Sequence, residues 1–168
     1  MDIDSIIRYK FQENSNMSFQ EIFDFSFKSL IPVLQNFAAQ MGKEQFMEML
    51  KKAAFDSMLQ STQESTRQLE QNDLAAYATL IKERSYFGEH VLTREIVEDT
   101  HSAFEIKVTE CLWAKVFREN SAADIGYSLL CHTDHAHCQG FNPHIRMVRT
   151  KTLMQGHDCC NHRYIWTE

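Results

Sequence analysis

The chain has 168 residues, of which 43% are hydrophobic and 24% charged, and 17 Lys and Arg against 23 Asp and Glu give a formal net charge of −6. This acidic balance, without a basic run, lacks the cationic surface that nucleic-acid binding needs, so we expect no nucleic-acid partner. With 5 Gly and 2 Pro, the composition also excludes disordered and collagen-like classes. We expect a single α+β domain over residues 1–168, with a helical part at residues 1–90 and a part carrying the sheet and the site at residues 91–168.

The cellular location is predicted from the N-terminus and the cysteines. The first residues, "MDIDSIIRYK", are acidic where a secretory signal peptide would be basic, and no small-residue cleavage site follows. The most apolar window, residues 25–42, contains Lys28 and Pro32 and suits a core helix better than a membrane span. The 5 cysteines all follow residue 110 and would stay free thiols in a reducing compartment. We expect a cytoplasmic protein without a membrane segment or a disulfide framework.

The first half of the chain has helical periodicity. After Ser18, a predicted N-cap, apolar residues recur at helical spacing as far as Met41, and Pro32 predicts either a kink or the start of a second helix. A further helix follows Gly42 and fades into the polar "QSTQEST" at residues 60–66, which is either a solvated face or a frayed end. A third helix begins near Asp73. The Phe and Met stripes of these helices are typical of a core.

After residue 90 the periodicity changes to that of strands. β-branched residues alternate in "HVLTREIVED" and "AFEIKVTE", and the short "THS" between them predicts a hairpin. The expected elements are strands at residues 90–99 and 103–110, helices at 111–120 and 122–141, and strands at 144–154 and 159–166. The sequence therefore predicts an α+β fold, with N-terminal helices followed by β-β-α-α-β-β and a four-stranded antiparallel sheet covered by helices.

The stretch "CHTDHAHCQG" is rich in residues that can carry chemistry. On a helix, Cys131, Asp134, His135 and Cys138 share one face. The other two histidines, His132 and His137, point elsewhere and are expected at the surface. No CxxC or HExxH motif is present, so we expect no metal cofactor. Two alternatives stay open. Two residues of this face could ligate a metal ion whose coordination is completed by Cys160 or His162, or the thiols belong to the core.

The last predicted strand carries a second candidate cluster. Alternation places Cys160, His162 and Tyr164 on one face and Arg163 on the other. Two residues apart on a strand, Cys160 and His162 lie about 6.8 Å apart, close enough for the imidazole to polarise the thiol. They are therefore a candidate nucleophile and base.

A third candidate is Cys111, which opens a predicted helix. The helix dipole there favours the thiolate, and Glu110 beside it could accept a proton. The alternative is a thiol packed in the core, because cysteine is among the most buried residue types.

Residues 109–166 resemble the L-2-amino-thiazoline-4-carboxylic acid hydrolase family. The matching pattern is Glu110 and Cys111 before a Trp-containing helix; Ile125, Gly126 and Tyr127; Cys131 and Asp134; Phe141, Asn142 and Pro143; and Gly156, Cys160, His162 and Tyr164. The resemblance implies hydrolysis of the cyclic isothiourea L-2-amino-thiazoline-4-carboxylate to N-carbamoyl-L-cysteine, a step towards cysteine.

Such a reaction needs four kinds of group. They are a partner for the amidinium-like nitrogens, a nucleophile or activated water, a proton donor for the sulfur, and a cation for the substrate carboxylate. The candidates are Asp134 and Glu110 for the amidinium; Cys160 or Cys131 as nucleophile; His162 as base and acid; and Arg146, Arg149 or Arg163 for the carboxylate, with Tyr164 and, as second choice, His135 near the substrate. Covalent attack by a thiol and direct attack by water both stay open.

The order of elements also resembles 4-vinyl-reductase-type ligand-binding domains. In that interpretation the Cys/His face lines a pocket that binds a small molecule without turnover. Both interpretations imply a small-molecule partner, and a homo-oligomer stays open in either.

Overall fold

The structure is a computed structural model that describes residues 17–83 and 86–167. Residues 1–16, which belong to the predicted helical half, lie outside the described residues. The first elements are α2 (Phe19–Met41), α3 (Lys43–Thr66), α4 (Leu74–Lys82), α5 (Tyr86–Val91), β1 (Leu92–Asp99) and β2 (Ala103–Cys111). They are followed by α6 (Leu112–Glu119), α7 (Ala123–Gly126), the π-helical turn η2 (Tyr127–Cys131), α8 (Thr133–Phe141), β3 (Ile145–Val148), the 3-10 turn η3 (Leu153–Gln155) and β4 (Cys160–Trp166). None of the helices in the described part of the chain is long and apolar enough to cross a membrane.

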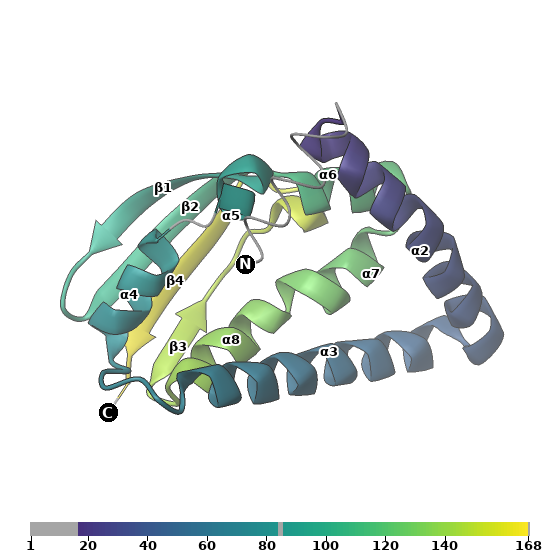
Figure 1. Ribbon diagram of the computed structural model, residues 1–168. Helices are drawn as coiled ribbons and strands as arrows, with labels where there is room; N and C mark the ends of the chain where they lie inside the picture. The colour runs from purple at the N-terminus through teal and green to yellow at the C-terminus, as the bar shows by residue number, and fades with distance from the viewer. Residues whose placement is uncertain (1–16, 84–85, 168) are drawn as a thin grey trace.

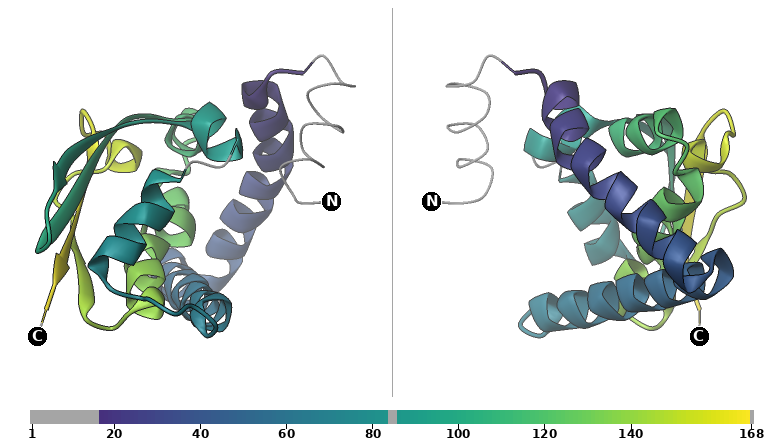
Figure 2. Two further views of the ribbon diagram at one scale, coloured as in Figure 1. Left: turned by 60° about the vertical axis from the view of Figure 1, so that its left-hand side comes forward. Right: turned by 90° about the vertical axis from the view of Figure 1, so that its right-hand side faces the viewer.

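The four strands form one antiparallel sheet in the order β1-β2-β4-β3. The helices lie on one side of it, as the views in Figures 1 and 2 show. This arrangement confirms the predicted fold class, an α+β fold with a four-stranded antiparallel sheet covered by helices.

The sheet has an inner face toward the helices and an outer face toward solvent. In the β2–β4 ladder, Cys160 pairs with the buried Val108, His162 with Ile106 and Tyr164 with Phe104. Because directly paired residues point to the same side of a sheet, all three residues of β4 lie on the inner face. The predicted alternation of Cys160, His162 and Tyr164 is thus confirmed.

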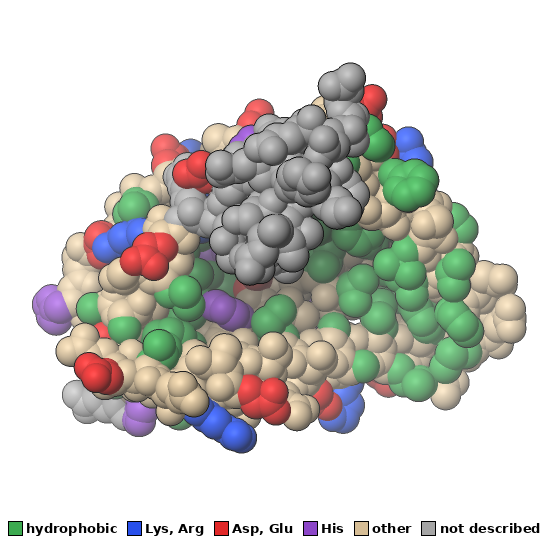
Figure 3. Space-filling view, in the orientation of Figure 1, with side chains coloured by type: hydrophobic (Ala, Val, Ile, Leu, Met, Phe, Trp, Pro, Cys, Tyr) green, Lys and Arg blue, Asp and Glu red, His purple; other side chains and the backbone are tan. Residues whose placement is uncertain are grey.

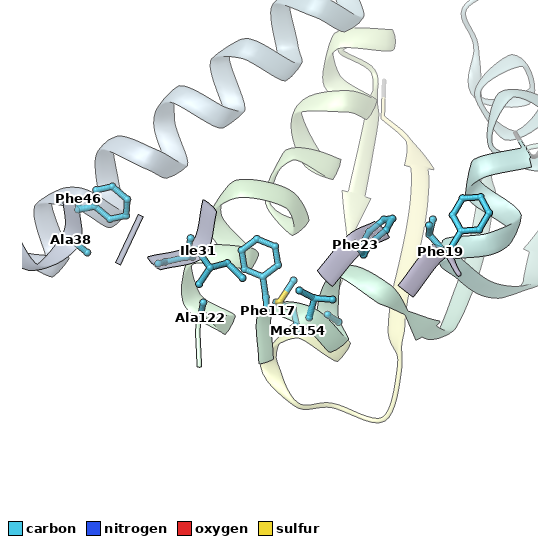
Figure 4. Packing of buried hydrophobic residues seen from close by; sticks show 12 residues of the cluster. Phe19, Phe23, Ile31, Ala38, Phe46, Phe117, Ala122 and Met154 are labelled. Carbon is cyan, nitrogen blue, oxygen red and sulfur yellow. The ribbon is translucent and has the colours of Figure 1, made fainter. Parts of the chain in front are cut away.

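Helix α2 begins with a capping box in which Ser18 accepts from the backbone of Glu21 and Glu21 accepts from the backbone of Ser18. This confirms the predicted N-cap. The helix continues through Pro32 as one element, so Pro32 does not start a second helix. Its buried residues pack with α3, α6, α7 and η3; the cluster in Figure 4 includes Phe19, Phe23, Ile31, Ala38, Phe46, Phe117, Ala122 and Met154.

Helix α3 includes the polar run at residues 60–66, so this run is a mostly solvated helix face and not a frayed end. Thr62 is buried, and its hydroxyl donates to the carbonyl of Met58. Here α3 crosses α8 at Gly140, where an added Cβ would lie 2.9 Å from the carbonyl oxygen of Leu59 and 2.9 Å from the Cβ of Thr62. Small and hydroxyl-bearing residues therefore allow the two helices to approach closely.

Strand β3 is shorter than the predicted strand at residues 144–154, because the chain leaves the ladder after Val148. The side chain of Asn161 replaces the missing strand partner, since its Oδ1 accepts from the backbone N–H groups of Thr150 and Lys151 at 3.0 and 2.7 Å. Thr152 then caps η3 by accepting from the backbone of Gln155. Arg149 lies where the chain departs from the sheet.

The close crossing at Gly140 gives a prediction for stability. We expect Gly140→Ala to lower the free energy of unfolding by about 1–3 kcal/mol, because the backbone of Leu59 must shift. This loss occurs although alanine favours a helix over glycine by about 1 kcal/mol. Urea denaturation measures the change. The control is Gln139→Ala at the exposed neighbouring position, which should stay within about 0.5 kcal/mol of wild type; a Gly140→Ala protein as stable as this control would contradict the close contact.

Candidate functional site

The helical run predicted at residues 122–141 is interrupted by a π turn. In η2 the backbone N–H of His132 donates to the carbonyl of Tyr127, five residues earlier, at 2.8 Å. A π turn adds a residue to one turn, so it rotates the following side chains relative to a regular helix. Cys131 lies at the end of this turn and Asp134 in the first turn of α8.

The π turn and α8 together hold the guanidinium of Arg149. Its Nη1 donates to Oδ2 of Asp134 at 2.6 Å and its Nη2 to the carbonyl of Cys131 at 2.8 Å. The guanidinium carbon also lies 5.7 Å from the centroid of the Tyr127 ring, within cation–π range. Only 2% of the Arg149 side chain is exposed, against 38% for Asp134. A buried cation therefore joins the loop after β3 to α8, and its carboxylate partner is the member of the pair that solvent reaches.

His162 of β4 completes this group. Its Nε2 lies 3.4 Å from Nη1 of Arg149 and 3.9 Å from Oδ2 of Asp134. Its Nδ1 lies 3.5 Å from the hydroxyl of Tyr164, which is buried against Tyr77 and Phe104. Asp134, Arg149 and His162 are called the polar triad below. The structure brings these three sequence-predicted candidates together on the inner face of the sheet.

The pKa values of the two basic groups of the polar triad are shifted in opposite directions. Burial lowers the pKa of His162 below the ordinary 6.5, although Asp134 acts in the opposite direction. For Arg149, burial also opposes the charged form, but Asp134 and Tyr127 outweigh it and the pKa is raised. The result is a neutral imidazole beside a permanent cation at neutral pH.

Three thiols lie close to the polar triad. Burial raises the pKa of Cys111 to about 11, and it also raises the pKa of Cys131 and of Cys160. The negative charge of Asp134 adds to each of these increases. Cys160 accepts from the backbone N–H of Leu153 at 3.2 Å. All three are protonated thiols at neutral pH.

Cys111 is the N-cap of α6, as its position in the sequence indicated, and its sulfur accepts from the backbone of Ala114 at 3.4 Å. Of the two alternatives for Cys111, the raised pKa favours the packed thiol over the thiolate, because desolvation outweighs the favourable helix N-terminus. Glu110 is exposed, and its carboxylate accepts from the hydroxyl of Thr93 at 2.5 Å.

Two of the three candidate arginines lie away from the polar triad. Arg163 is on the outer face of the sheet, where it pairs with Glu98 and Glu105. Arg146 is exposed on β3 between the buried Ile145 and Met147, so it also points outward. The structure therefore does not support Arg146 or Arg163 as a ligand for a substrate on the inner face.

The remaining residues of "CHTDHAHCQG" depart from the prediction. His132 is half-buried among Phe55, Tyr127 and His135, and burial lowers its pKa to about 4. His137 is also half-buried, with its Nδ1 2.9 Å from the hydroxyl of Tyr77. The predicted surface position of these two histidines is therefore wrong. Helices α3 and α4 cover the side of α8 that a lone helix would expose.

The other two residues of the predicted helix face, His135 and Cys138, lie in different surroundings. His135 remains near the polar triad, and burial lowers its pKa, with Arg149 and Asp134 as the next largest influences. Cys138 is buried in the core between α8 and the sheet, where its thiol donates to the carbonyl of His135 at 3.2 Å. Tyr127, which contacts Arg149, was not predicted as a site residue, although it belongs to the Ile-Gly-Tyr motif.

A cavity of about 690 Å³ adjoins this region. Its lining includes Glu110, Cys111, Lys115, Arg118 and Leu153, but not the polar triad. The cavity reaches two of the three thiols. Cys111 is itself a lining residue, and the lining residue Leu153 donates its backbone N–H to the sulfur of Cys160. In the described part of the chain, no group of three or more His, Cys, Asp or Glu side chains is placed to hold a metal ion.

The fold and the enclosed polar triad define the class of protein: an α+β domain that carries titratable groups between a sheet and its helical layer. The structure is similar to the crystal structure of the phenol-responsive sensory domain of the transcription activator PoxR with phenol, with a TM-score of 0.52 and 11% sequence identity over 82% of this chain and 73% of that chain. At this identity the similarity shows a shared fold.

The sequence itself places the chain in a family. The model of the L-2-amino-thiazoline-4-carboxylic acid hydrolase family matches residues 16–164, and the chain belongs to this family. The resemblance predicted from the sequence is thus confirmed. The comparison with curated proteins found no match.

The Asp134–Arg149 pair gives a prediction for stability. We expect Asp134→Ala to lower the free energy of unfolding by about 1–3 kcal/mol, because it leaves the buried Arg149 without its counter-charge. The loss should be smaller than the about 3–5 kcal/mol of a fully buried pair, because Asp134 is partly exposed. The control is Asp158→Ala, which breaks the exposed pair with Lys151 and should leave the denaturation midpoint unchanged. Equal midpoints for both variants would contradict this assignment.

Proposed function

We propose that the protein hydrolyses a cyclic isothiourea or amidine, L-2-amino-thiazoline-4-carboxylate or a close relative, to the ring-opened carbamoyl thiol. The single observation that carries this proposal is the polar triad, in which the neutral imidazole of His162 faces the carboxylate of Asp134 beside the fixed Arg149. Membership of the hydrolase family supports the substrate class. A proton-transfer group and an amidinium partner are thereby available in one place.

The proposed reaction adds water to the ring carbon that is bonded to sulfur and two nitrogens. The oxygen of water forms a bond to this carbon in the protonated ring while the electron pair of the carbon–nitrogen double bond moves to nitrogen. The carbon–oxygen double bond then forms as the hydroxyl proton is released to solvent, the carbon–sulfur bond breaks, and the sulfur leaves with the electron pair and takes up a proton. The neutral His162 accepts a proton from water and returns one to the sulfur. Asp134 uses its Oδ2 for Arg149, so its Oδ1 is the oxygen that faces the amidinium-like nitrogens.

Direct attack by water is preferred over covalent attack by a thiol. The thiolate is the nucleophilic form of cysteine, and burial keeps Cys111, Cys131 and Cys160 protonated. Among the described residues, Nε2 of His162 is directed at Arg149 and Asp134 rather than at a cysteine sulfur. We therefore assign the thiols to the wall of the site.

Arg149 acts here as a positioning residue. Both of its terminal nitrogens already bind protein groups, Asp134 and the carbonyl of Cys131. Its role is to orient the Asp134 carboxylate, rather than to bind the substrate carboxylate as the sequence indicated.

This assignment predicts the effect of substitutions on turnover. We expect His162→Gln and Asp134→Asn to lower kcat/KM for L-2-amino-thiazoline-4-carboxylate by about 100-fold or more, the contribution typical of a proton-transfer group. Cys160→Ser should retain activity within about tenfold, because no covalent bond forms to its sulfur. Release of a free thiol measures turnover. The matched control for Arg149→Lys is Arg146→Lys on the outer face, and only Arg149→Lys should lose activity. A folded but inactive Cys160→Ser protein would instead favour covalent attack by the thiol.

The pH dependence of turnover follows from the lowered pKa of His162. A base works in its neutral form, and burial keeps His162 neutral to a pH below 6.5. We therefore expect the decline of kcat/KM toward acid pH to be centred below pH 6.5. The residual activity of His162→Gln should lack this decline. A wild-type decline centred above pH 6.5 would argue against His162 as the base.

A second candidate function is ligand binding without turnover, which the fold shared with a phenol-responsive sensory domain supports. In this case the polar triad and the adjoining cavity would bind a small molecule and no product would form. Calorimetric binding of L-2-amino-thiazoline-4-carboxylate with no release of thiol, in a protein whose Asp134→Asn variant binds less tightly, would favour this function over hydrolysis.

A further inference from the structure

Helix α2 exposes a stripe of large apolar side chains. Leu30, Val33, Phe37 and Met41 are 40%, 49%, 51% and 37% exposed. Their spacing of three, four and four residues places them on one side of the helix. Figure 3 shows hydrophobic side chains gathered along this helix on the right of the view. These four residues are called the α2 stripe below.

The α2 stripe belongs to a surface segment without charge. Residues 29–42 contain no Asp, Glu, Lys, Arg or His, although most of their side chains are at least partly exposed. An exposed helix normally carries charged residues, and their depletion is the compositional mark of the centre of a protein interface. The core residues of α2, Ile31 and Ala38, occupy the adjoining side of the helix, so the stripe is a separate apolar face.

The exposed apolar area is appropriate for an interface between proteins. The four side chains of the stripe together expose an area on the order of 400 Å² per copy. A stable interface takes about 800 Å² from each partner, of which a little over half is non-polar. The largest apolar patch on a protein surface is typically about 300–600 Å² and often functional, so the stripe has the size of an interaction site.

We propose that the α2 stripe is the centre of a two-fold symmetric dimer of this chain, in which α2 packs antiparallel against α2 of a second copy with the axis near Val33. Leu30 then faces Phe37 of the partner, and each face is its own complement because it has no charge to repel the other. This surface is distinct from the polar triad, so the proposal does not depend on the proposed function.

The absence of charge also distinguishes the proposed partner from a lipid surface. Helices that bind membranes carry Lys and Arg beside their apolar face, and these attract anionic lipids. The α2 stripe has no such residue between Ser29 and Gly42, and the whole chain has a net charge of −6.

The first test compares two matched substitutions by sedimentation equilibrium of the full chain. Val33→Lys should raise the dimer dissociation constant about 100-fold, because both copies place a lysine near the axis. Val97→Lys is the control, since Val97 is 55% exposed on β1 away from α2. Circular dichroism melting checks that both variants fold. A wild-type protein that is monomeric at 100 µM, or a folded Val33→Lys protein that dimerises like wild type, would overturn the proposal.

The second test is independent of affinity. In the antiparallel dimer the two Val33 residues meet near the axis, whereas the two Met41 residues lie about 22 Å apart along the helices. Under mild oxidation Val33→Cys should form a disulfide-linked dimer, and Met41→Cys should behave like wild type, since a disulfide spans less than about 7 Å between Cα atoms. Linkage of both variants would overturn the antiparallel arrangement. Binding of monomeric wild type to phosphatidylcholine vesicles would overturn the dimer and assign the stripe to lipid.

Discussion

The burial of one guanidinium determines how the elements around the site are arranged. Moving the charge of Arg149 out of water costs several kcal/mol unless other groups replace its hydration. Asp134, the carbonyl of Cys131 and the Tyr127 ring do so, and they come from α8, the end of the π turn and its start. A regular helix would place these groups differently. The π turn and α8 therefore together provide the groups that replace the hydration of the buried guanidinium.

The same dry environment acts in opposite directions on the acids and bases of the inner face. Desolvation disfavours the charged form of any group, so it raises the pKa of a thiol and lowers that of an imidazole. Cys111, Cys131 and Cys160 thus lose reactivity as nucleophiles, while His162 gains the neutral form that a base requires. Burial therefore separates the cysteines from the histidine as chemical candidates, which residue type and spacing could not do.

The sequence contains most of the fold, because hydrophobic periodicity and alternation directly report which side of an element is buried. Alternation could also have separated the arginines: Ile145 and Met147 point inward, so a residue at 149 continues that side while Arg146 faces outward. The π turn was not predictable from the spacing of residues 122–141, because a single added residue in one turn leaves an amphipathic pattern almost unchanged. The half-buried His132 and His137 depend on α3 and α4, which are distant in sequence.

The arrangement of the site places a constraint on any substrate. Because Arg149 is engaged within the protein, an anionic group of the substrate must bind a different cation, and the lining of the adjoining cavity provides Lys115 and Arg118 on α6. Cys111 begins the same helix and belongs to the thiols beside the polar triad. Helix α6 thus connects the charged lining of the cavity to the region of the polar triad, where the proposed function places proton transfer. For the proposed function, a substrate with a reactive ring and a carboxylate at opposite ends matches this division. Lys115 and Arg118 donate to Gln20 and to the carbonyl of Leu153, and such a carboxylate would replace one of these partners.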